Sequence, residues 1–221
     1  MKSTNVTKLG LLSDLHGDAQ GLQVALEWFD AQGVSQVLCA GDISDRGSDV
    51  HEIVAVFKAR GIICIAGNHD RAISDHQEHY RASERQDRLK ELGRIVDDET
   101  LDYLVDLPAN WTGEIAGSML MMGHGTPTSD VIGLFPDSRT GHYRRLVENY
   151  PDVDIMILGH THFPMDLRTQ NLRVINPGSI YALTIRDSHS CAILHLPSGQ
   201  LDFYDVKHRR PLSIEPSVIG I

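Results

Sequence analysis

Acidic and imidazole side chains stand close behind short apolar runs in this sequence. Asp14 and His16 follow the run KLGLL, and His160 and His162 follow DIMIL, with one residue between the members of each pair. In extended backbone, residues two positions apart point to the same side and lie roughly 6 to 7 Å apart, so each pair could face one site. Either pair alone also fits side chains that simply pack at the end of a strand.

Three further apolar runs end in the same way. Asp42 follows QVLCA, Asn68 and His69 follow IICIA, and His124 follows SMLMM. One zinc ion usually takes about three or four protein ligands, whereas two ions about 3.5 to 4 Å apart could use a larger set with one carboxylate shared between them. The candidate metal ligands are two carboxylates, one amide and four imidazoles: Asp14, His16, Asp42, Asn68, His124, His160 and His162.

The first part of the chain predicts three strand-loop-helix units. The runs KLGLL, QVLCA and IICIA indicate buried strands, and the segments 19–32 and 50–61 indicate helices. The third unit leads into a charged stretch that begins at Arg71. In α/β sheets, ligands bind in the crevice outside the carboxyl ends of the strands, where loops from several units meet. The candidate ligands stand at that position in each unit.

The second half is richer in predicted strands. Six short apolar or alternating runs lie between residues 111 and 206, with one predicted helix at Thr140–Asn149. We therefore predict an α+β fold with an α/β-like first half, in which two sheets stack and helices lie outside them. No low-complexity linker divides the chain, so we expect a single domain over residues 1–221. Within it, residues 71–107 fit a solvated helix, a lid over the site or a partner surface.

Composition limits the class of protein. At 221 residues with 41% apolar residues, the chain suits a globular domain with a full hydrophobic core. The formal charge of −10 disfavours a surface that follows the phosphates of long nucleic acids. Three widely spaced cysteines suit a reducing compartment, and no run approaches the roughly 18 apolar residues of a membrane span. We expect a cytoplasmic protein without a membrane or bulk nucleic-acid partner, and the sequence leaves open whether it forms a homo-oligomer.

Five blocks in fixed order resemble the calcineurin-like metallophosphoesterase superfamily, whose pattern reads D-x-H, G-D, G-N-H-D/E, H and G-H-x-H. They stand here as Asp14-Leu15-His16, Gly41-Asp42, Gly67-Asn68-His69-Asp70, His124 and Gly159-His160-Thr161-His162. The strings HGTP at 124–127 and INPGS at 175–179 are similar to the small bacterial and archaeal phosphodiesterase-type branch. The resemblance covers nearly the whole chain. It implies a metallo-dependent phosphatase fold, a four-layer sandwich of two mixed sheets between helices.

The resemblance also implies two divalent ions. One would be held by Asp14, His16, Asp42 and His162, and the other by Asp42, Asn68, His124 and His160. Oxygen and imidazole ligands without thiolate suit Mn²⁺, Fe²⁺, Zn²⁺, Co²⁺ or Ni²⁺, of which we favour Mn²⁺. The implied enzyme is a metal-dependent phosphoric ester hydrolase. In it, a metal-bridging hydroxide, available because the metal lowers the pKa of bound water to roughly 7, attacks a small phosphodiester or nucleotide-type substrate.

His69 lies outside the implied metal ligands and is our candidate general acid for the leaving group. The stretch GDISDRG, residues 41–47, is similar to the G-D-x-x-D-R-G block of the superfamily's serine/threonine protein phosphatases. That similarity implies that Asp45 pairs with His69 and that Arg46 meets the phosphate, so Arg46, Asn68 and His69 are candidate substrate contacts. A surface ion pair between Asp45 and Arg46 fits the same stretch, and Asp70 fits an acidic residue that favours the start of a helix.

The mixture of blocks leaves two other functions open. The first is a phosphomonoesterase or serine/threonine phosphoprotein phosphatase with the same mechanism, which the arginine at position 46 favours. The second is a catalytically weak scaffold that keeps the fold, although a scaffold has no use for a general acid at His69. The segment GTPTSDVIGLFPDS after His124 carries two prolines, and we expect it to line the substrate pocket.

Overall fold

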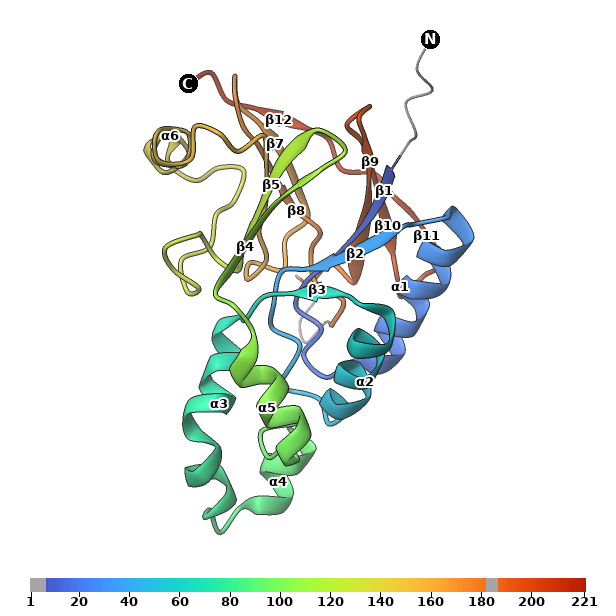
Figure 1. The fold of residues 1–221 in the computed structure, drawn as a ribbon, viewed down its shortest axis with the longest axis vertical. Coiled ribbons are helices and arrows are strands. Elements are labelled where there is room, and N and C mark those ends of the chain that lie inside the picture. Colours follow the sequence, from blue (N-terminus) through green and yellow to red (C-terminus); the bar gives the residue numbers. More distant parts are fainter. Residues whose placement is uncertain (1–6, 182–186) are drawn as a thin grey trace.

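The protein folds into two six-stranded sheets with helices around them (Figure 1). A computed structural model describes residues 7–181 and 187–221. The first sheet has the order β11-β10-β9-β1-β2-β3, with β1 Thr7–Leu12, β2 Gln36–Cys39, β3 Ile63–Cys64, β9 Ser190–Leu196, β10 Gln200–Asp205 and β11 Arg210–Leu212. The second has the order β12-β7-β8-β6-β5-β4, with β4 Asn110–Ile115, β5 Ser118–Gly123, β6 Ile155–Ile157, β7 Met165–Arg168, β8 Arg173–Asn176 and β12 Ser217–Val218. The helices of the described ranges are α1 Ala19–Gln32, α2 Val50–Arg60, α3 Asn68–Arg81, α4 Gln86–Glu91, α5 Asp98–Asp106 and α6 Thr140–Asn149.

Local sequence signals bound the first crossover helices. The side chain of Asp18 accepts a hydrogen bond from the Gly21 amide and caps the start of α1, and Gly33 ends that helix in the left-handed conformation. Gly61 ends α2 in the same way. Because α1 joins β1 to β2 and α2 joins β2 to β3, the three strands run parallel, and their carboxyl ends meet at one edge of the sheet.

The second sheet repeats this arrangement with β5, β6 and β8. These strands are parallel to one another, while β4 is antiparallel to β5 and β7 is antiparallel to β8. In the first sheet, β9 is antiparallel to β1. Both sheets are therefore mixed, as the resemblance implied.

Three apolar cores hold four layers together. The middle core lies between the sheets and contains Leu11 of β1 and Ile157 of β6. Leu12 points the other way and packs with Phe29 of α1 in the core between the first sheet and its helices, because successive side chains of a strand face opposite sides. Tyr143 of α6 packs in the third core, outside the second sheet. The four-layer sandwich is confirmed, and the single-domain organisation stays a prediction that the shared middle core supports.

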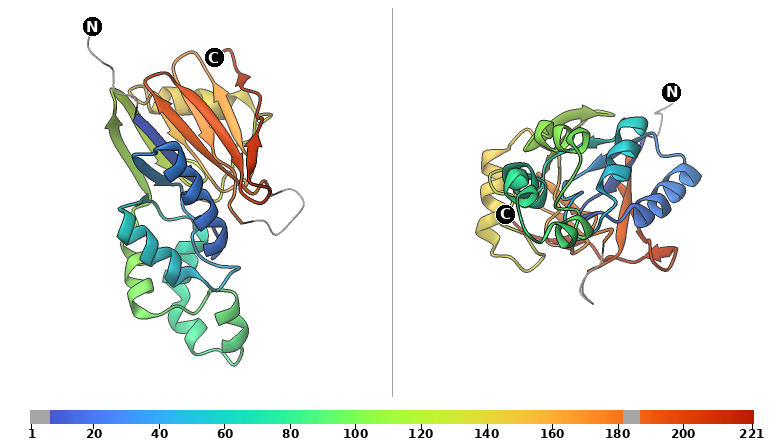
Figure 2. Two further views of the ribbon diagram at one scale, coloured as in Figure 1. Left: turned by 90° about the vertical axis from the view of Figure 1, so that its right-hand side faces the viewer. Right: turned by 90° about the horizontal axis from the view of Figure 1, so that it is seen from below.

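The segment between β3 and β4 forms a helical group at one end of the molecule. Figure 2 shows α3, α4 and α5 beyond the sheets, at the end opposite the carboxyl terminus. Helix α3 is polar, with Ile73 as its large buried apolar side chain. The predicted helical content of 71–107 is confirmed, divided among three helices, and its role as a lid stays a prediction.

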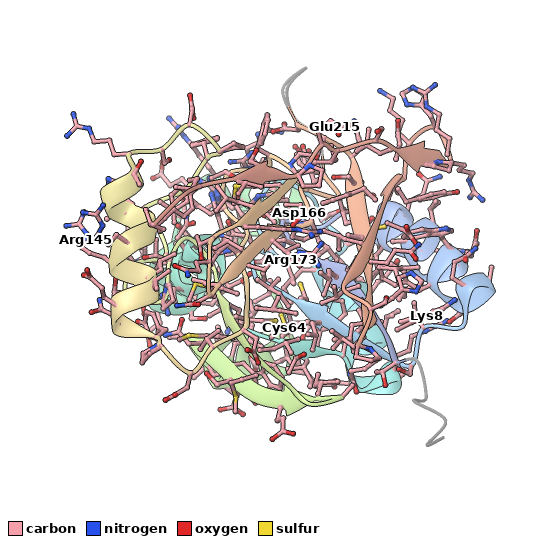
Figure 3. All side chains as sticks on the ribbon, turned by 90° about the horizontal axis from the view of Figure 1, so that it is seen from above. Lys8, Cys64, Arg145, Asp166, Arg173 and Glu215 are labelled. Carbon is pink, nitrogen blue, oxygen red and sulfur yellow. The ribbon has the colours of Figure 1, made fainter. Side chains whose placement is uncertain are left out.

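Strands β7, β11 and β12 were absent from the predicted elements. In β7, Asp166 is buried and breaks the apolar pattern that identified the other strands. Its carboxylate accepts hydrogen bonds from Nε of Arg173 on β8 at 2.7 Å and from Nη2 of Arg168 at 3.1 Å, and Asp166 and Arg173 lie on neighbouring strands in Figure 3. Strands β11 and β12 are short edge strands with exposed residues, so no apolar run marks them.

The three cysteines are buried free thiols. Cys64 lies at the end of β3, and burial raises the pKa of its thiol well above the usual value. Across the described ranges, no helix has the length and apolar character needed to cross a membrane.

Candidate metal centre

The loops at the carboxyl ends of β1, β2, β3, β5 and β6 converge on one place. They bring the ligand atoms of six candidate residues into two groups, each with its atoms within 4.8 Å of one another: Asp14, His16 and His162 in the first, and Asp42, His124 and His160 in the second. The seventh candidate, Asn68, joins the second group, because its Oδ1 lies 3.0 Å from Nδ1 of His160. The structure thus brings together every side chain proposed as a metal ligand.

The side chains of the first group lie in the interior, with Asp14 and His16 fully buried and His162 9% exposed. Nε2 of His16 lies 3.2 Å from Nε2 of His162, which in turn lies 3.3 Å from Oδ1 of Asp14. The other ring nitrogen of each histidine is already used, since Nδ1 of His16 lies 3.0 Å from the Ser44 carbonyl oxygen and Nδ1 of His162 lies 2.8 Å from a carboxylate oxygen of Asp187. Those oxygens only accept, so each Nδ1 carries the hydrogen and each Nε2 presents a lone pair.

The second group contains buried polar atoms without a partner. Nδ1 of His124 donates to the Ala40 carbonyl oxygen at 2.7 Å, so Nε2, 3.1 Å from Oδ2 of Asp42, is the nitrogen that a cation would bind in place of a proton. Among the described residues, the buried side-chain atoms that lack a hydrogen bond are Nε2 of His124 and Oδ1 of Asp14. Leaving such atoms unpaired in the interior is costly. Lone pairs and carboxylate oxygens that face one another fit divalent cations, so the donor set suits the ions that the resemblance implied.

Asp42 lies between the two groups. Its Oδ2 is 3.1 Å from Nε2 of His124 and 3.9 Å from Nε2 of His16, so one oxygen faces an imidazole of each group. Its Oδ1 accepts a hydrogen bond from the His69 amide at 2.9 Å. This geometry supports the bridging position proposed for Asp42.

The charges of the centre are set by burial and by opposite charges. Burial lowers the pKa of His16 to about 4. Burial also acts against the charged form of His124, but Asp42 and Asp14 outweigh it and raise that pKa to about 10. Burial would raise the pKa of Asp14 and of Asp42, yet the facing imidazoles lower both. Both carboxylates are therefore ionised, and the centre attracts cations.

The backbone around the centre is strained. Ten non-glycine residues of the described ranges have positive φ, and seven of them lie here: Asp14, His16, Asp42, Asp45, Arg46, His160 and His162. This conformation costs of order 1–3 kcal/mol for each residue that adopts it. The sequence suggested extended backbone for the Asp14–His16 and His160–His162 pairs, and that was wrong. The members of each pair reach the same centre through left-handed turns instead.

Asp70 fixes the loop that carries Asp42. Its buried carboxylate accepts hydrogen bonds from the amides of Gly67 at 2.9 Å, Asp42 at 2.8 Å and Ser44 at 3.0 Å. The bond to Gly67 closes the first turn of α3, which agrees with the expected role at a helix start. The other bonds join the loop after β2 to α3, a positioning role that the sequence did not reveal.

His69 belongs to a hydrogen-bonded chain with Asp45 and Arg94. Nδ1 of His69 lies 2.6 Å from Oδ2 of Asp45, and Nε and Nη2 of Arg94 hold the two oxygens of the same carboxylate at 2.7 and 3.1 Å. The hydrogen bond to Asp45 raises the pKa of His69 despite partial burial. The His69 ring lies edge-on to that of His16, 5.0 Å between centroids. His69 therefore faces the metal centre with its Nδ1 fixed from behind.

Asp45 forms its ion pair with Arg94 and not with Arg46, which was the surface pair that the sequence left open. No hydrogen bond or ion pair of the Arg46 guanidinium occurs within residues 7–181 and 187–221, although its amide donates to Oδ1 of Asp45 at 2.9 Å. Arg94 comes from the turn between α4 and α5, where Gly93 has φ 63° and lies against the Gly47 carbonyl. Arg94 belongs to no sequence block, so its role depends on how the helical group packs.

Two more contacts that the sequence did not indicate orient the ligands. Asp187 holds His162, as described above, and Nδ2 of Asn176 donates to the Gly159 carbonyl oxygen at 2.7 Å. Asn176 belongs to the INPGS string, which was noted as a family feature without a structural role. Partners of ligating histidines orient the ring and select its tautomer.

The segment after His124 runs beside the centre, and its role as a wall of the substrate pocket stays a prediction. A cavity of about 150 Å³ lies against His124 and is lined by residues 126–130 of this segment, with Arg71 and Asn110 opposite. Arg71 forms an ion pair with Asp130 at 2.7 Å. The lining is polar, but its charged groups neutralise each other.

Comparison with known proteins identifies the fold and the family. A model described as a calcineurin-like phosphoesterase superfamily domain matches residues 7–199. An uncharacterised protein of Methanocaldococcus jannaschii is 25% identical over 183 residues, which are 78% of this chain and 70% of that protein.

Solved structures from an archaeon and a bacterium share this fold. A hypothetical protein from Pyrococcus horikoshii has a TM-score of 0.75 at 21% identity, over 89% of this chain and 86% of that one. A metallophosphoesterase from Sphaerobacter thermophilus has a TM-score of 0.71 at 21% identity, over 96% of this chain and 90% of that one. These structures agree with the small-branch resemblance.

Proposed function

We propose that this chain, which belongs to the calcineurin-like phosphoesterase superfamily and is a metal-dependent phosphoric ester hydrolase, uses two divalent ions, preferentially Mn²⁺, to hydrolyse a small phosphodiester or nucleotide-type substrate. The observation that supports it most directly is the pair of buried ligand groups that share Asp42, with Nε2 of His124 and Oδ1 of Asp14 left without hydrogen-bond partners. A cation in each group would give these two atoms the partner that each of them lacks.

The ions and the chain have separate tasks. Ions held by the two groups would supply an acidified water and positive charge at the non-bridging phosphate oxygens. The chain orients their ligands through Ser44, Ala40 and Asp187, and it excludes water from His16 and His124, which are almost completely buried. The ionised carboxylates of Asp14 and Asp42 draw the cations in.

His69 would protonate the leaving oxygen. Its Nδ1 hydrogen is committed to Asp45, so Nε2 is the atom that holds the transferable proton. The hydrogen bond to Asp45 favours the protonated ring and so keeps an acid beside the centre. A catalytically weak scaffold would gain nothing from this arrangement, which makes that alternative the less supported one.

Hydrolysis assays with leaving groups of different basicity test the proposal. Purified protein with Mn²⁺ should hydrolyse bis(p-nitrophenyl) phosphate, and a general acid should matter most when the leaving alkoxide is basic. We expect His69→Ala to lower kcat about 10²-fold or more on an alkyl ester and less on the p-nitrophenyl ester, with two ions still bound. His79→Ala, an exposed histidine of the same helix, is the matched control. Equal turnover by His69→Ala and the parent on both esters would remove the acid role.

Arg46 favours a second candidate function, a phosphomonoesterase or serine/threonine phosphoprotein phosphatase. Its guanidinium is not engaged by the described part of the chain, and it lies beside the centre through Asp45. A monoester dianion offers one more charged oxygen than a diester for such a group to bind. Arg46→Ala should raise KM for p-nitrophenyl phosphate more than for the diester if the protein prefers monoesters, and equal changes would argue for the diester.

A further inference from the structure

Exposed apolar side chains gather beside the metal centre. Six large hydrophobic side chains of the described ranges are exposed, and four of them come from the segments that follow His124 and His162. These four, which we call the apolar rim, are Val131, Ile132, Phe135 and Phe163, exposed by 62, 51, 41 and 46%. The rings of Phe135 and Phe163 lie 6.2 Å apart between centroids. A contiguous apolar patch on a globular surface marks a binding site.

The rim is joined to the metal ligands. A Cβ on Gly133 would lie 2.4 Å from Cγ2 of Thr161 and 3.2 Å from Cδ2 of His160, so the loop packs directly on this ligand. Phe163 follows the ligand His162 in the chain. A phosphate group at the centre would therefore have the rim within reach of its ester substituents.

The rim is held in place and is not a frayed loop tip. The Tyr143 hydroxyl of α6 donates to the Phe135 carbonyl oxygen at 2.6 Å, and Leu134 is buried in the core between α6 and the second sheet. At the other end of the loop, Asp130 is paired with Arg71. The apolar side chains are thus displayed on an anchored segment, where they stabilise no core and remain available for a ligand.

We propose that the apolar rim binds an uncharged aromatic substituent of the phosphate ester, an aryl group or a nucleobase, while the phosphate occupies the metal centre. This rests on the proposed function and names its substrate class. Residues 131–136, VIGLFP, carry no charge in a chain of net charge −10, so a neutral group suits the surface and a charged one does not. Two phenyl rings offer the edges and faces on which an aromatic group packs.

Non-hydrolysable phosphonates test the rim separately from catalysis. We would titrate Mn²⁺-loaded protein with phenylphosphonate and methylphosphonate by calorimetry, because both place the same head group at the metal centre. The parent should bind phenylphosphonate about tenfold more tightly. Phe163→Ala and Ile132→Ser should reduce that preference to less than twofold and leave the affinity for methylphosphonate unchanged. Both replaced side chains are exposed, so thermal unfolding should stay at the parental temperature.

Exposed valines far from the centre along the chain supply the control. Val105→Ala on α5 and Val218→Ala on β12 remove comparable exposed apolar groups and should keep the phenyl preference. Methylphosphonate binding without a phenyl preference in the parent overturns the rim proposal alone, as would loss of the preference in both controls. Failure to bind either phosphonate contradicts the proposed function as well. A parental dimer that Phe163→Ala converts to monomer in sedimentation would instead make the rim a contact between two copies, and the proposal would be wrong.

Discussion

Two clusters of charged residues around buried carboxylates, one at Asp166 and one at Asp14 and Asp42, satisfy their carboxylate oxygens in different ways. Asp166 in the second sheet is 4% exposed, and its oxygens are occupied by the guanidinium groups of Arg173 and Arg168. Asp14 and Asp42 are 0 and 1% exposed, and they face imidazole lone pairs, with one oxygen of Asp14 left without a hydrogen bond. The first cluster is complete within the chain, while the second requires cations from solution.

The backbone of the two clusters also differs, being regular in the first and strained in the second. Asp166 and Arg173 lie on the paired strands β7 and β8, where regular hydrogen bonding positions them without strain. Asp14 and Asp42 lie on loops in the left-handed region of φ. A buried ion pair that the chain completes contributes to the fold, whereas a strained and incomplete set of ligands is retained for what it binds. Five predictions test this difference.

The largest effect is expected for Asp42→Asn. The change removes a charge that both ligand groups share, so we expect kcat/KM to fall at least about 10³-fold, or about 4 kcal/mol of transition-state stabilisation. Asparagine keeps the acceptor for the His69 amide, and losing the charge relieves the repulsion between Asp42 and Asp14, so the free energy of unfolding of the metal-free protein should change less than for Asp166→Asn. Steady-state kinetics and urea unfolding in chelator measure these two quantities. A strongly destabilised apo-protein would show that Asp42 is structural.

Asp166→Asn should give the opposite result. The change leaves the largely buried guanidinium of Arg173 without a carboxylate partner, and we expect a loss of about 3 kcal/mol in the free energy of unfolding. The metal content and KM should be those of the parent. Urea unfolding at neutral pH measures the loss, and Asp154→Asn, at an exposed position just before β6, is the comparison. Loss of metal with intact stability would contradict the assignment.

Comparison of the parent with Asp166→Asn should also show that the stabilisation by Asp166 depends on pH. Burial would raise the pKa of Asp166, but Arg173 and Arg168 outweigh it and lower that pKa. The stabilisation is therefore fully present above the unfolded value of about 3.9 and is lost as the pH falls through the lower folded value. The difference between parent and Asp166→Asn should be constant from pH 7 to about pH 5 and should shrink below about pH 4. A difference that grows with acid would show that another group is responsible.

Metal removal should destabilise the parent by an intermediate amount. Cations bound only by the folded chain stabilise it by about 2.7 kcal/mol at a hundred times their dissociation constant. Chelation should lower the thermal midpoint of the parent and of Asp166→Asn equally, and it should leave Asp42→Asn nearly unchanged. Differential scanning calorimetry with and without chelator makes the comparison. An equal shift in all three proteins would mean that the stabilising ion binds elsewhere.

The smallest effect concerns Arg94, which acts on the reaction only through Asp45 and His69. Arg94→Ala should lower kcat about tenfold on an alkyl ester, which is less than the roughly 10²-fold that a general acid contributes at the low end of its range. The loss should be smaller on a p-nitrophenyl ester, and KM should stay unchanged. Arg94→Lys should restore part of the loss, since a lysine keeps one hydrogen bond to the carboxylate. Equal losses on both esters would indicate that Arg94 only supports the fold.

Part of the fold could be read from the sequence because the signals are local. The cap at Asp18, the glycine at position 33 and the apolar spacing of α1 act within a few residues, and α6 was predicted with its observed bounds. The strand β7 escaped prediction because the partner that makes Asp166 tolerable lies on another strand. The same reason applies to Arg94, which meets Asp45 only after three helices have packed.

By itself, the sequence determined which residue types could serve as ligands and where they stand, because a polar side chain close behind an apolar strand is visible without coordinates. Only the tertiary structure decided that Asp14 and His162 share one group, that Asp70 and Arg94 hold the loop after β2, and that Gly133 packs against His160. These relations join residues far apart in the chain. They exist because the strand ends of two stacked sheets meet at one edge, which no local pattern can specify.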